Sequence, residues 1–137
     1  MRYDLLKGFE YASAGQNTTA EFIEVDSPNN LVSDDVLFLD TQFYKVMNSA
    51  SDNSETTKDS KSDDKIETKQ FYMGLASTDG VNMSKCFDSL KRILSKTAKV
   101  DGRERFTNLI FDKMDINDTK MLLGWYIENF LYTFLVS

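Results

Sequence analysis

The chain has 137 residues, of which 41% are hydrophobic and 12% aromatic, and it contains a single proline. This length suits one domain with its own core, and this composition excludes wholesale disorder. The net charge of −6 and the pI of about 4.6 exclude the broad basic surface with which proteins bind nucleic acid or anionic membranes.

The first 30 residues are predicted to form a β-hairpin. Phe9 and Tyr11 alternate with polar neighbours, and so do the apolar residues of Phe22–Val25, which is typical of half-buried strands. Between them, residues 13–19 (SAGQNTT) supply turn residues. Pro28 ends the second strand, because proline cannot continue a hydrogen-bonded ladder.

A helix and then a polar segment are expected in the middle of the chain. Residues 31–48 carry apolar residues at helical spacing, and Ser33 is a suitable N-cap for them. Residues 49–70 break this pattern, since Ile66 is their one large aliphatic residue and they contain no aromatic residue. We predict a mobile polar loop there, either a solvated spacer or a docking loop.

Residues 71–137 are predicted to be helical. Asn82 or Ser84 caps a helix with one apolar stripe, and Asp101 with Glu104 resembles a capping box that opens the next helix. The residues of that next helix expected to face inward are Phe106, Leu109, Ile110 and Met114. The whole chain is thus predicted to be a single α+β domain, residues 1–137, in which a hairpin precedes four or five helices.

The sequence lacks the residues that form the commonest catalytic and metal-binding sites. The chain has no histidine, and its single cysteine, Cys86, is expected to be a small buried hydrophobe. There is no glycine-rich phosphate loop, and an EF-hand beginning at Asp115 fails because Lys120 stands where glycine is needed. We therefore predict that the protein is not an enzyme and binds no metal or cofactor.

The start of the chain indicates the compartment. Asp4 and Glu10 interrupt the apolar stretch that an export signal requires. We expect a protein of the reducing cytoplasm, which also agrees with a lone cysteine.

The chain closes on an apolar and aromatic segment, KMLLGWYIENFLYTFLVS, from Lys120 to Ser137. A membrane helix needs about 20 apolar residues, and here Glu128 stands near the middle, so no membrane span is expected. At about 100° per residue the apolar residues form two stripes. The stripe predicted to face the core contains Leu123, Ile127, Phe130, Leu131 and Phe134. The second stripe is the candidate partner-binding surface: Met121, Trp125, Tyr132 and Val136.

Two interpretations of the second stripe stay open. A helix that is apolar on two sides is either sandwiched within its own domain or shared with another chain. Tryptophan and tyrosine are favoured at interface hot spots, which supports sharing, and the terminal element of a small domain is expected to be peripheral. Self-association into a homo-oligomer is one form of such sharing.

The opening residues LLKGFEY with AEFIEVDSP, the helix after Pro28 and the ending INDTKMLLGWYIENFL resemble the small tail assembly chaperones of long-tailed bacteriophages, of the lambda G type. The matching positions of the ending are Tyr126, Asn129 and Phe130. The resemblance touches both ends of the chain, and the polar insertion departs from the family's pattern.

This resemblance implies a non-catalytic late protein of the infected host's cytoplasm. Proteins of that family bind the long tape measure protein, keep it soluble and help tail tube subunits polymerise around it. The expected partners are therefore the tape measure protein and the tail tube protein, with no nucleic acid and no membrane. The alternative is an acidic inhibitor that mimics DNA and occupies a host factor.

Overall fold

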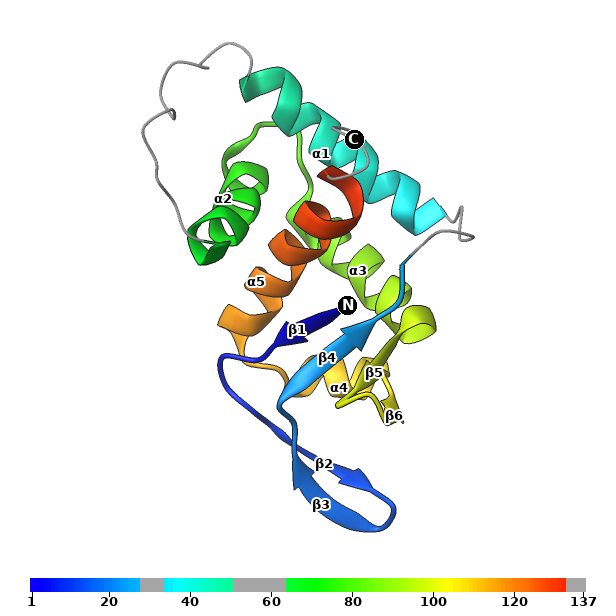
Figure 1. Ribbon diagram of the computed structural model, residues 1–137. Coiled ribbons are helices and arrows are strands. Elements are labelled where there is room, and N and C mark those ends of the chain that lie inside the picture. The colour runs from blue at the N-terminus through cyan, green and yellow to red at the C-terminus, as the bar shows by residue number, and fades with distance from the viewer. Residues whose placement is uncertain (28–33, 51–63, 133–137) are drawn as a thin grey trace.

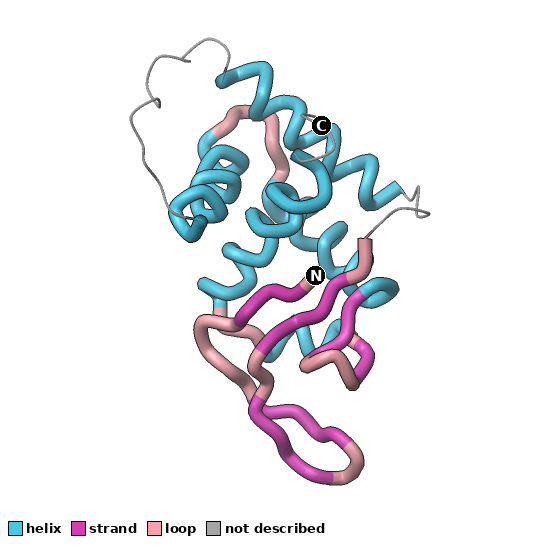
Figure 2. Tube along the Cα trace, viewed as in Figure 1, coloured by secondary structure: helices cyan, strands magenta, loops and turns pink. Residues whose placement is uncertain are grey.

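A computed structural model describes residues 1–27, 34–50 and 64–132, and it confirms the predicted α+β fold, with strands near the N-terminus followed by five α-helices (Figures 1 and 2). The strands are β1 (Arg2–Asp4), β2 (Glu10–Ser13), β3 (Gln16–Thr19), β4 (Phe22–Val25), β5 (Ala98–Val100) and β6 (Glu104–Arg105). The helices are α1 (Asp34–Ala50), α2 (Asp64–Ser77), α3 (Met83–Thr97), α4 (Asn108–Lys113), α5 (Ile116–Tyr126) and the π-helix η2 (Ile127–Tyr132).

The main sheet has four antiparallel strands in the order β1-β4-β5-β6. Its register places Tyr3 beside Ile23 and Ile23 beside Val100, while Val25 lies beside Ala98. All five are buried, and α1, α2, α3 and α5 lie together on one side of this sheet (Figure 1). Along β1 and β5, the buried residues alternate with exposed ones, which are Arg2, Asp4 and Lys99.

The predicted hairpin is present, but its second strand lies elsewhere than expected. It consists of β2 and β3, which close through Ala14 and Gly15, and the φ angles of these two residues are 53° and 81°. Positive φ at both positions is the geometry of the tight hairpin turn whose twist matches that of its strands. Residues 16–19 are therefore strand and not turn, and β4 leaves the hairpin to join β1 and β5.

The terminal helix runs through the middle of the molecule and not along its periphery. In Figure 1, α5 lies between α2 and α3. A side chain at Gly124 would place its Cβ 2.5 Å from the carbonyl oxygen of Thr68 and 3.1 Å from the amide nitrogen of Tyr72. Glycine is thus what allows α5 to approach the backbone of α2 so closely.

Two expectations for the second half are wrong. Asp101 has a φ of 55° and belongs to the turn between β5 and β6, so it opens no helix; Glu104 is in β6. The cap of α4 is Thr107, whose side chain accepts a hydrogen bond from the Ile110 N–H. Leu109 is 74% exposed, because α4 is too short to bury more than one face. The predicted cap of α3 is confirmed at Asn82, whose side chain accepts a hydrogen bond from the Lys85 N–H.

The polar segment is described only in part. Helix α2 already begins at Asp64, so the last seven residues of the predicted loop (64–70) are helical. Of the loop predicted over residues 49–70, residues 51–63 lie outside the described residues. Within the described parts of the chain, no helix is both long and apolar enough to cross a membrane.

Candidate partner-binding site

The terminal segment is not the regular α-helix from which the two apolar stripes were derived. Helix α5 starts at Ile116 and continues from Ile127 as the π-helix η2, in which backbone hydrogen bonds join residues five apart. Consequently Trp125 and Phe130, assigned to opposite stripes, touch each other with ring centroids 5.7 Å apart. The prediction that they lie on opposite sides of the helix is wrong, because it assumed a constant angle per residue.

Most of this segment packs inside its own domain. The buried residues of α5 and η2 include those predicted for the core stripe within the described range, and also residues between the stripes: Leu122, Leu123, Gly124, Tyr126, Ile127, Phe130 and Leu131. Of the predicted partner-binding residues, Met121 and Trp125 are half-buried. The side chain of Tyr132 and the whole of Val136 lie outside the described residues. Sandwiching therefore describes most of the helix, while Met121 and Trp125 keep part of their surface accessible.

Met121 and Trp125 line one pocket. It has a volume of about 260 Å³ and lies between β1, α2 and the second half of α5. Leu6 lines this pocket and is 59% exposed. The complete set of lining residues is Arg2, Tyr3, Asp4, Leu6, Thr68, Met121 and Trp125. The structure thus joins two residues predicted from the terminal helix to an N-terminal strand that the sequence did not predict.

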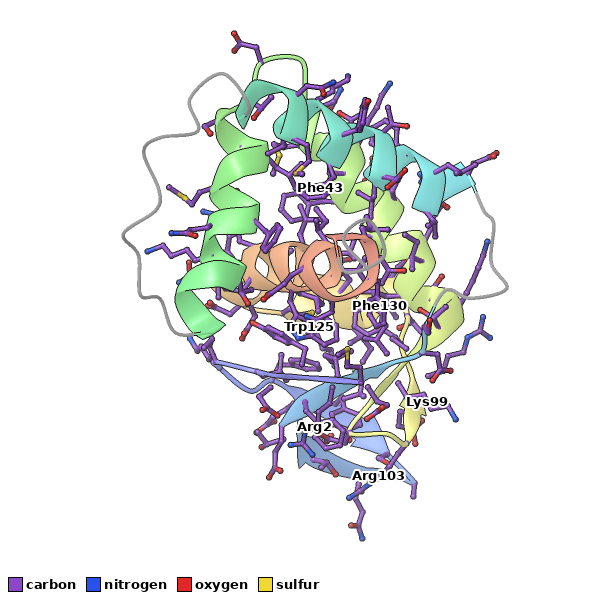
Figure 3. The ribbon with its side chains drawn as sticks, turned by 45° about the horizontal axis from the view of Figure 1, so that its top comes forward. Arg2, Phe43, Lys99, Arg103, Trp125 and Phe130 are labelled. Carbon is purple, nitrogen blue, oxygen red and sulfur yellow. The ribbon has the colours of Figure 1, made fainter. Side chains whose placement is uncertain are left out.

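Trp125 belongs both to the core and to the pocket. Its ring meets Tyr3 edge-on, with centroids 5.8 Å apart, and Phe130 at 5.7 Å. Figure 3 places it between the sheet and α5, next to Phe130. Such edge-to-face contacts fix the orientation of an aromatic ring. The indole is therefore held in place while part of its surface faces the pocket.

The buried carboxylate of Asp118 attaches β1 to α5. Its Oδ1 accepts hydrogen bonds from the Tyr3 hydroxyl at 2.8 Å and from the Leu6 N–H at 2.7 Å, and its Oδ2 accepts one from the Lys7 N–H at 2.9 Å. A buried carboxylate is tolerated when several donors satisfy its oxygens. Burial and the bond to Asp118 raise the pKa of the Tyr3 phenol. Asp118 thereby fixes the position of Tyr3 and Leu6 at the pocket.

A second aspartate anchors the base of the hairpin in the same way. The Tyr11 hydroxyl donates to Asp101 Oδ2 at 2.6 Å, and the N–H groups of Glu21 and Phe22 donate to Oδ1 at 2.8 and 3.2 Å. Burial raises the pKa of the Asp101 carboxyl, but these hydrogen bonds outweigh it and the pKa lies below its ordinary value. Burial and the bond to Asp101 raise the pKa of Tyr11 to about 12.

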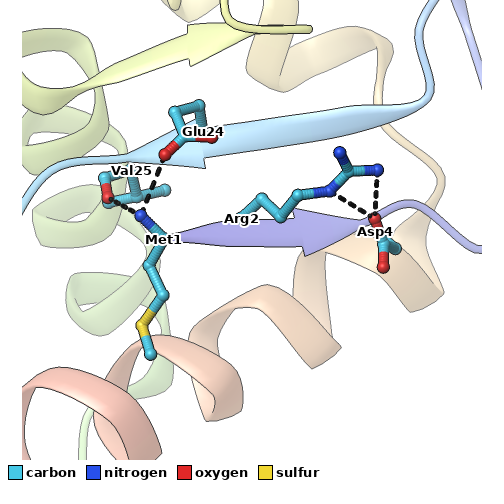
Figure 4. A network of polar contacts seen from close by, with 5 residues as sticks. All are labelled: Met1, Arg2, Asp4, Glu24 and Val25. Atoms are coloured by element: carbon cyan, nitrogen blue, oxygen red, sulfur yellow. Dashed lines mark hydrogen bonds and ion pairs between the residues drawn. The ribbon is translucent and has the colours of Figure 1, made fainter.

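Within the part of the chain that the structure describes, the backbone of β1 is hydrogen-bonded on one side only. The Leu5 N–H donates to the Glu21 carbonyl oxygen at 3.0 Å, while Met1 and Val25 exchange two hydrogen bonds of 2.7 and 3.2 Å. Paired and unpaired positions alternate in an antiparallel ladder, so the odd-numbered residues of β1 turn their backbone groups toward β4. Among the described residues no strand lies beyond β1 (Figure 4). The backbone groups that face this open edge are those of Arg2 and Asp4.

Opposite charges lie along this edge. Arg2 contacts Asp4 with nitrogen–oxygen distances of 2.9 and 3.0 Å, and its guanidinium lies 3.8 Å from the ring centroid of Phe22. On the same strand the Met1 amino group is 2.9 Å from Glu24 Oε2 (Figure 4). The edge thus offers backbone donors and acceptors beside one positive and one negative side chain.

On the α2 side of the pocket, a polar contact joins two helices. The Thr68 hydroxyl donates to Glu128 Oε1 at 2.6 Å and so links α2 to η2. The described residues contain no group of three or more Cys, Asp or Glu side chains placed to hold a metal ion. The chemistry that this site supports is therefore contact with an apolar group, next to backbone groups that can pair with an extended chain.

No protein family, characterised protein or solved structure was found to match this chain at a significant level.

Proposed function

We propose that this protein is a non-catalytic assembly chaperone that binds an apolar segment of another protein at the pocket between β1 and α5. The observation that carries the proposal is the combination of an open apolar pocket with an unpaired strand edge at its border. Trp125 supplies fixed, half-buried apolar surface, Met121 is half-buried beside it, and Leu6 supplies exposed apolar surface. Surface of this kind is favoured where proteins recognise other chains.

The size of the pocket favours a protein partner over a small ligand. Sites for cofactors and drug-sized molecules are about 300–1,000 Å³ and enclose most of the ligand. The pocket here is about 260 Å³, which suits one or two side chains of a longer chain. The adjacent edge of β1 then provides contacts for the backbone on either side of those side chains.

The class of client comes from the resemblance to tail assembly chaperones. On that basis the client is the tape measure protein, the tail tube protein is a second partner, and the complex forms in the cytoplasm of an infected host. The three positions that carry the resemblance support the site indirectly. Tyr126 and Phe130 are core residues in ring contact at 4.8 Å, and the Asn129 side chain donates to the Trp125 carbonyl oxygen at 2.9 Å.

The alternative of an acidic inhibitor that mimics DNA has two fewer carboxylates to draw on. A mimic must display its carboxylates on a structured surface. Asp118 is fully buried, and the oxygens of Asp118 and Asp101 accept hydrogen bonds from their own chain. These two carboxylates stabilise the fold and are not available for display.

The test begins with the genes that flank this one: a long helical protein encoded there is the expected client, and it is co-expressed with this chain, with the soluble fraction of that client as the readout. The client is expected to stay soluble with the wild-type chain and to aggregate with the Leu6→Glu or Met121→Glu chain, because a carboxylate at the pocket opposes apolar contact. Leu109→Glu is the matched control, since Leu109 is also an exposed leucine but is not at the pocket. A client equally soluble with and without the wild-type chain would refute the proposal.

A further inference from the structure

The open edge of β1 carries a pattern of charges that is complementary to itself. We propose that two copies of this chain pair through their β1 strands, antiparallel, with Arg2 of each copy opposite Asp4 of the other. This proposal goes beyond chaperone function, which does not require it: the second copy would occupy the edge of β1 that the client's backbone would use, so a client would have to displace it. It rests on the hydrogen-bonding register of β1, on its charges, and on two exposed apolar residues at its ends.

The register follows from which residues have free backbone groups. At the open edge these are Arg2 and Asp4, so any strand that pairs there must bond to these two. A second copy can align them in three ways: Arg2 with Arg2, Asp4 with Asp4, or Arg2 with Asp4. Like charges directly opposite are destabilising, whereas opposite charges are stabilising. Only the third alignment avoids like charges, and it also uses both residues of each strand.

In this alignment the two strands form four backbone hydrogen bonds. Each Arg2–Asp4 pair exchanges two of them, as hydrogen-bonded pairs of antiparallel strands do. The arrangement is two-fold symmetric about Tyr3, and a two-fold interface needs a surface that is complementary to itself. Each Arg2 already contacts Asp4 of its own chain, so the pairing would assemble four alternating charges on the outer face of a continuous sheet.

The alignment also covers apolar surface. It places Met1 of one copy opposite Leu5 of the other and beside Leu6. Met1 and Leu6 are 58% and 59% exposed in the single chain. In Figure 4 the Met1 side chain extends from β1 toward the helices, which is the side where the pocket lies. Met1 of the second copy therefore reaches the end of the pocket that Leu6 lines.

The pairing is expected to be weak. β1 has three residues, and small interfaces form transient complexes. We expect a dissociation constant on the order of 100 μM. Two charge-reversed chains test the register: Arg2→Glu and Asp4→Lys. Each alone places like charges opposite each other in the proposed alignment. Mixed in equal amounts, they place opposite charges at both pairs.

Sedimentation velocity from about 10 μM to about 1 mM brackets this dissociation constant. The wild-type chain should shift from monomer to dimer, each reversed chain alone should stay monomeric, and their mixture should form the dimer again. The chain with both Arg2→Asp and Asp4→Arg should dimerise like the wild type. Since Arg2 and Asp4 are exposed, all variants should fold, and equal melting temperatures would show it.

A second pair of variants tests the backbone contribution. Asp4→Ala and Asp4→Pro both remove the carboxylate, but only proline removes the N–H that faces the open edge. Asp4→Pro should weaken dimerisation about tenfold more than Asp4→Ala does. A wild-type chain that stays monomeric at about 1 mM, or a mixture of reversed chains that stays monomeric, would overturn the proposal. These experiments contain no client, so failure here leaves the chaperone proposal standing.

Discussion

Removal of the Asp118 carboxylate should detach β1 from α5. In Asp118→Ala the Tyr3 hydroxyl and two backbone N–H groups lose their acceptor, and the Tyr3 side chain is only 6% exposed. A hydrogen bond to a charged group contributes about 1.5–3 kcal/mol, and an unsatisfied buried donor costs about 1–3 kcal/mol. The two N–H groups are only partly buried, so water can replace part of the loss. We expect a decrease of about 3–5 kcal/mol in the free energy of unfolding.

Two milder variants of the same contact should destabilise the fold less than Asp118→Ala does. Asp118→Asn keeps one acceptor oxygen but turns an NH₂ group toward the Lys7 N–H, and should cost about 2 kcal/mol. Tyr3→Phe removes one of the three hydrogen bonds and should cost about 1 kcal/mol. Asp112→Ala is the control, because that side chain is 67% exposed and its ion pair with Lys91 is 4.0 Å long; it should change stability by less than about 0.5 kcal/mol.

Urea unfolding followed by circular dichroism measures all four variants. If Asp118→Ala costs no more than Asp112→Ala, the three hydrogen bonds do not stabilise the fold and β1 is not held as described. If Asp118→Asn costs as much as Asp118→Ala, the acceptor oxygen that it keeps contributes nothing. In either case the position of Tyr3 and Leu6 at the pocket would need another explanation.

Three further predictions concern the core and the pH dependence. Phe130→Ala should lower the free energy of unfolding by about 3–5 kcal/mol, because it opens a cavity beneath Trp125. Trp125→Ala should lower it by only about 1–2 kcal/mol, because Trp125 is half-buried. Equal losses would mean that Trp125 is as much a core residue as Phe130. Gly124→Ala should lower stability by about 2–3 kcal/mol through its clash with the α2 backbone, and Gly74→Ala, which meets only a side-chain methyl at 3.2 Å, should cost less. The folded-state pKa of Tyr11, about 12, is above its ordinary value of about 10. The stability that the protonated Tyr11 hydroxyl contributes to the fold is therefore complete below about pH 10 and is lost as the pH rises toward 12. Over this pH range the melting temperature of Tyr11→Phe should fall less than that of the wild type.

Sequence periodicity predicted the elements that bury one continuous stripe. Helix α3 has its core residues at helical spacing, and its cap at Asn82 agrees with the prediction. Helix α5 is likewise capped locally, because the Asp115 side chain accepts a hydrogen bond from the Asn117 N–H. Local capping and regular burial are properties of a short stretch of sequence, and these features therefore needed no knowledge of the rest of the chain.

The site depended on features that no short stretch of sequence reveals. β1 has three residues, too few for a periodic pattern, and is a strand only because β4 pairs with it. Asp118 looked like an ordinary polar residue of a first helical turn, yet its partners are more than 110 residues away in the sequence. The change from α- to π-helix at Ile127 moved Phe130 next to Trp125, and this change cannot be read from periodicity. Met121 and Trp125 were found as candidates, but Leu6 and Tyr3 were not.

The most direct test of the pocket as a partner site uses the fluorescence of Trp125, the only tryptophan of the chain. Titration with the client protein should shift its emission to shorter wavelength as the pocket is covered. The Leu6→Glu chain should need about tenfold more client for the same shift, and the Leu109→Glu chain should behave like the wild type. Client binding without any change in Trp125 emission, or equal effects of the two leucine substitutions, would place the binding surface elsewhere and contradict the proposed site.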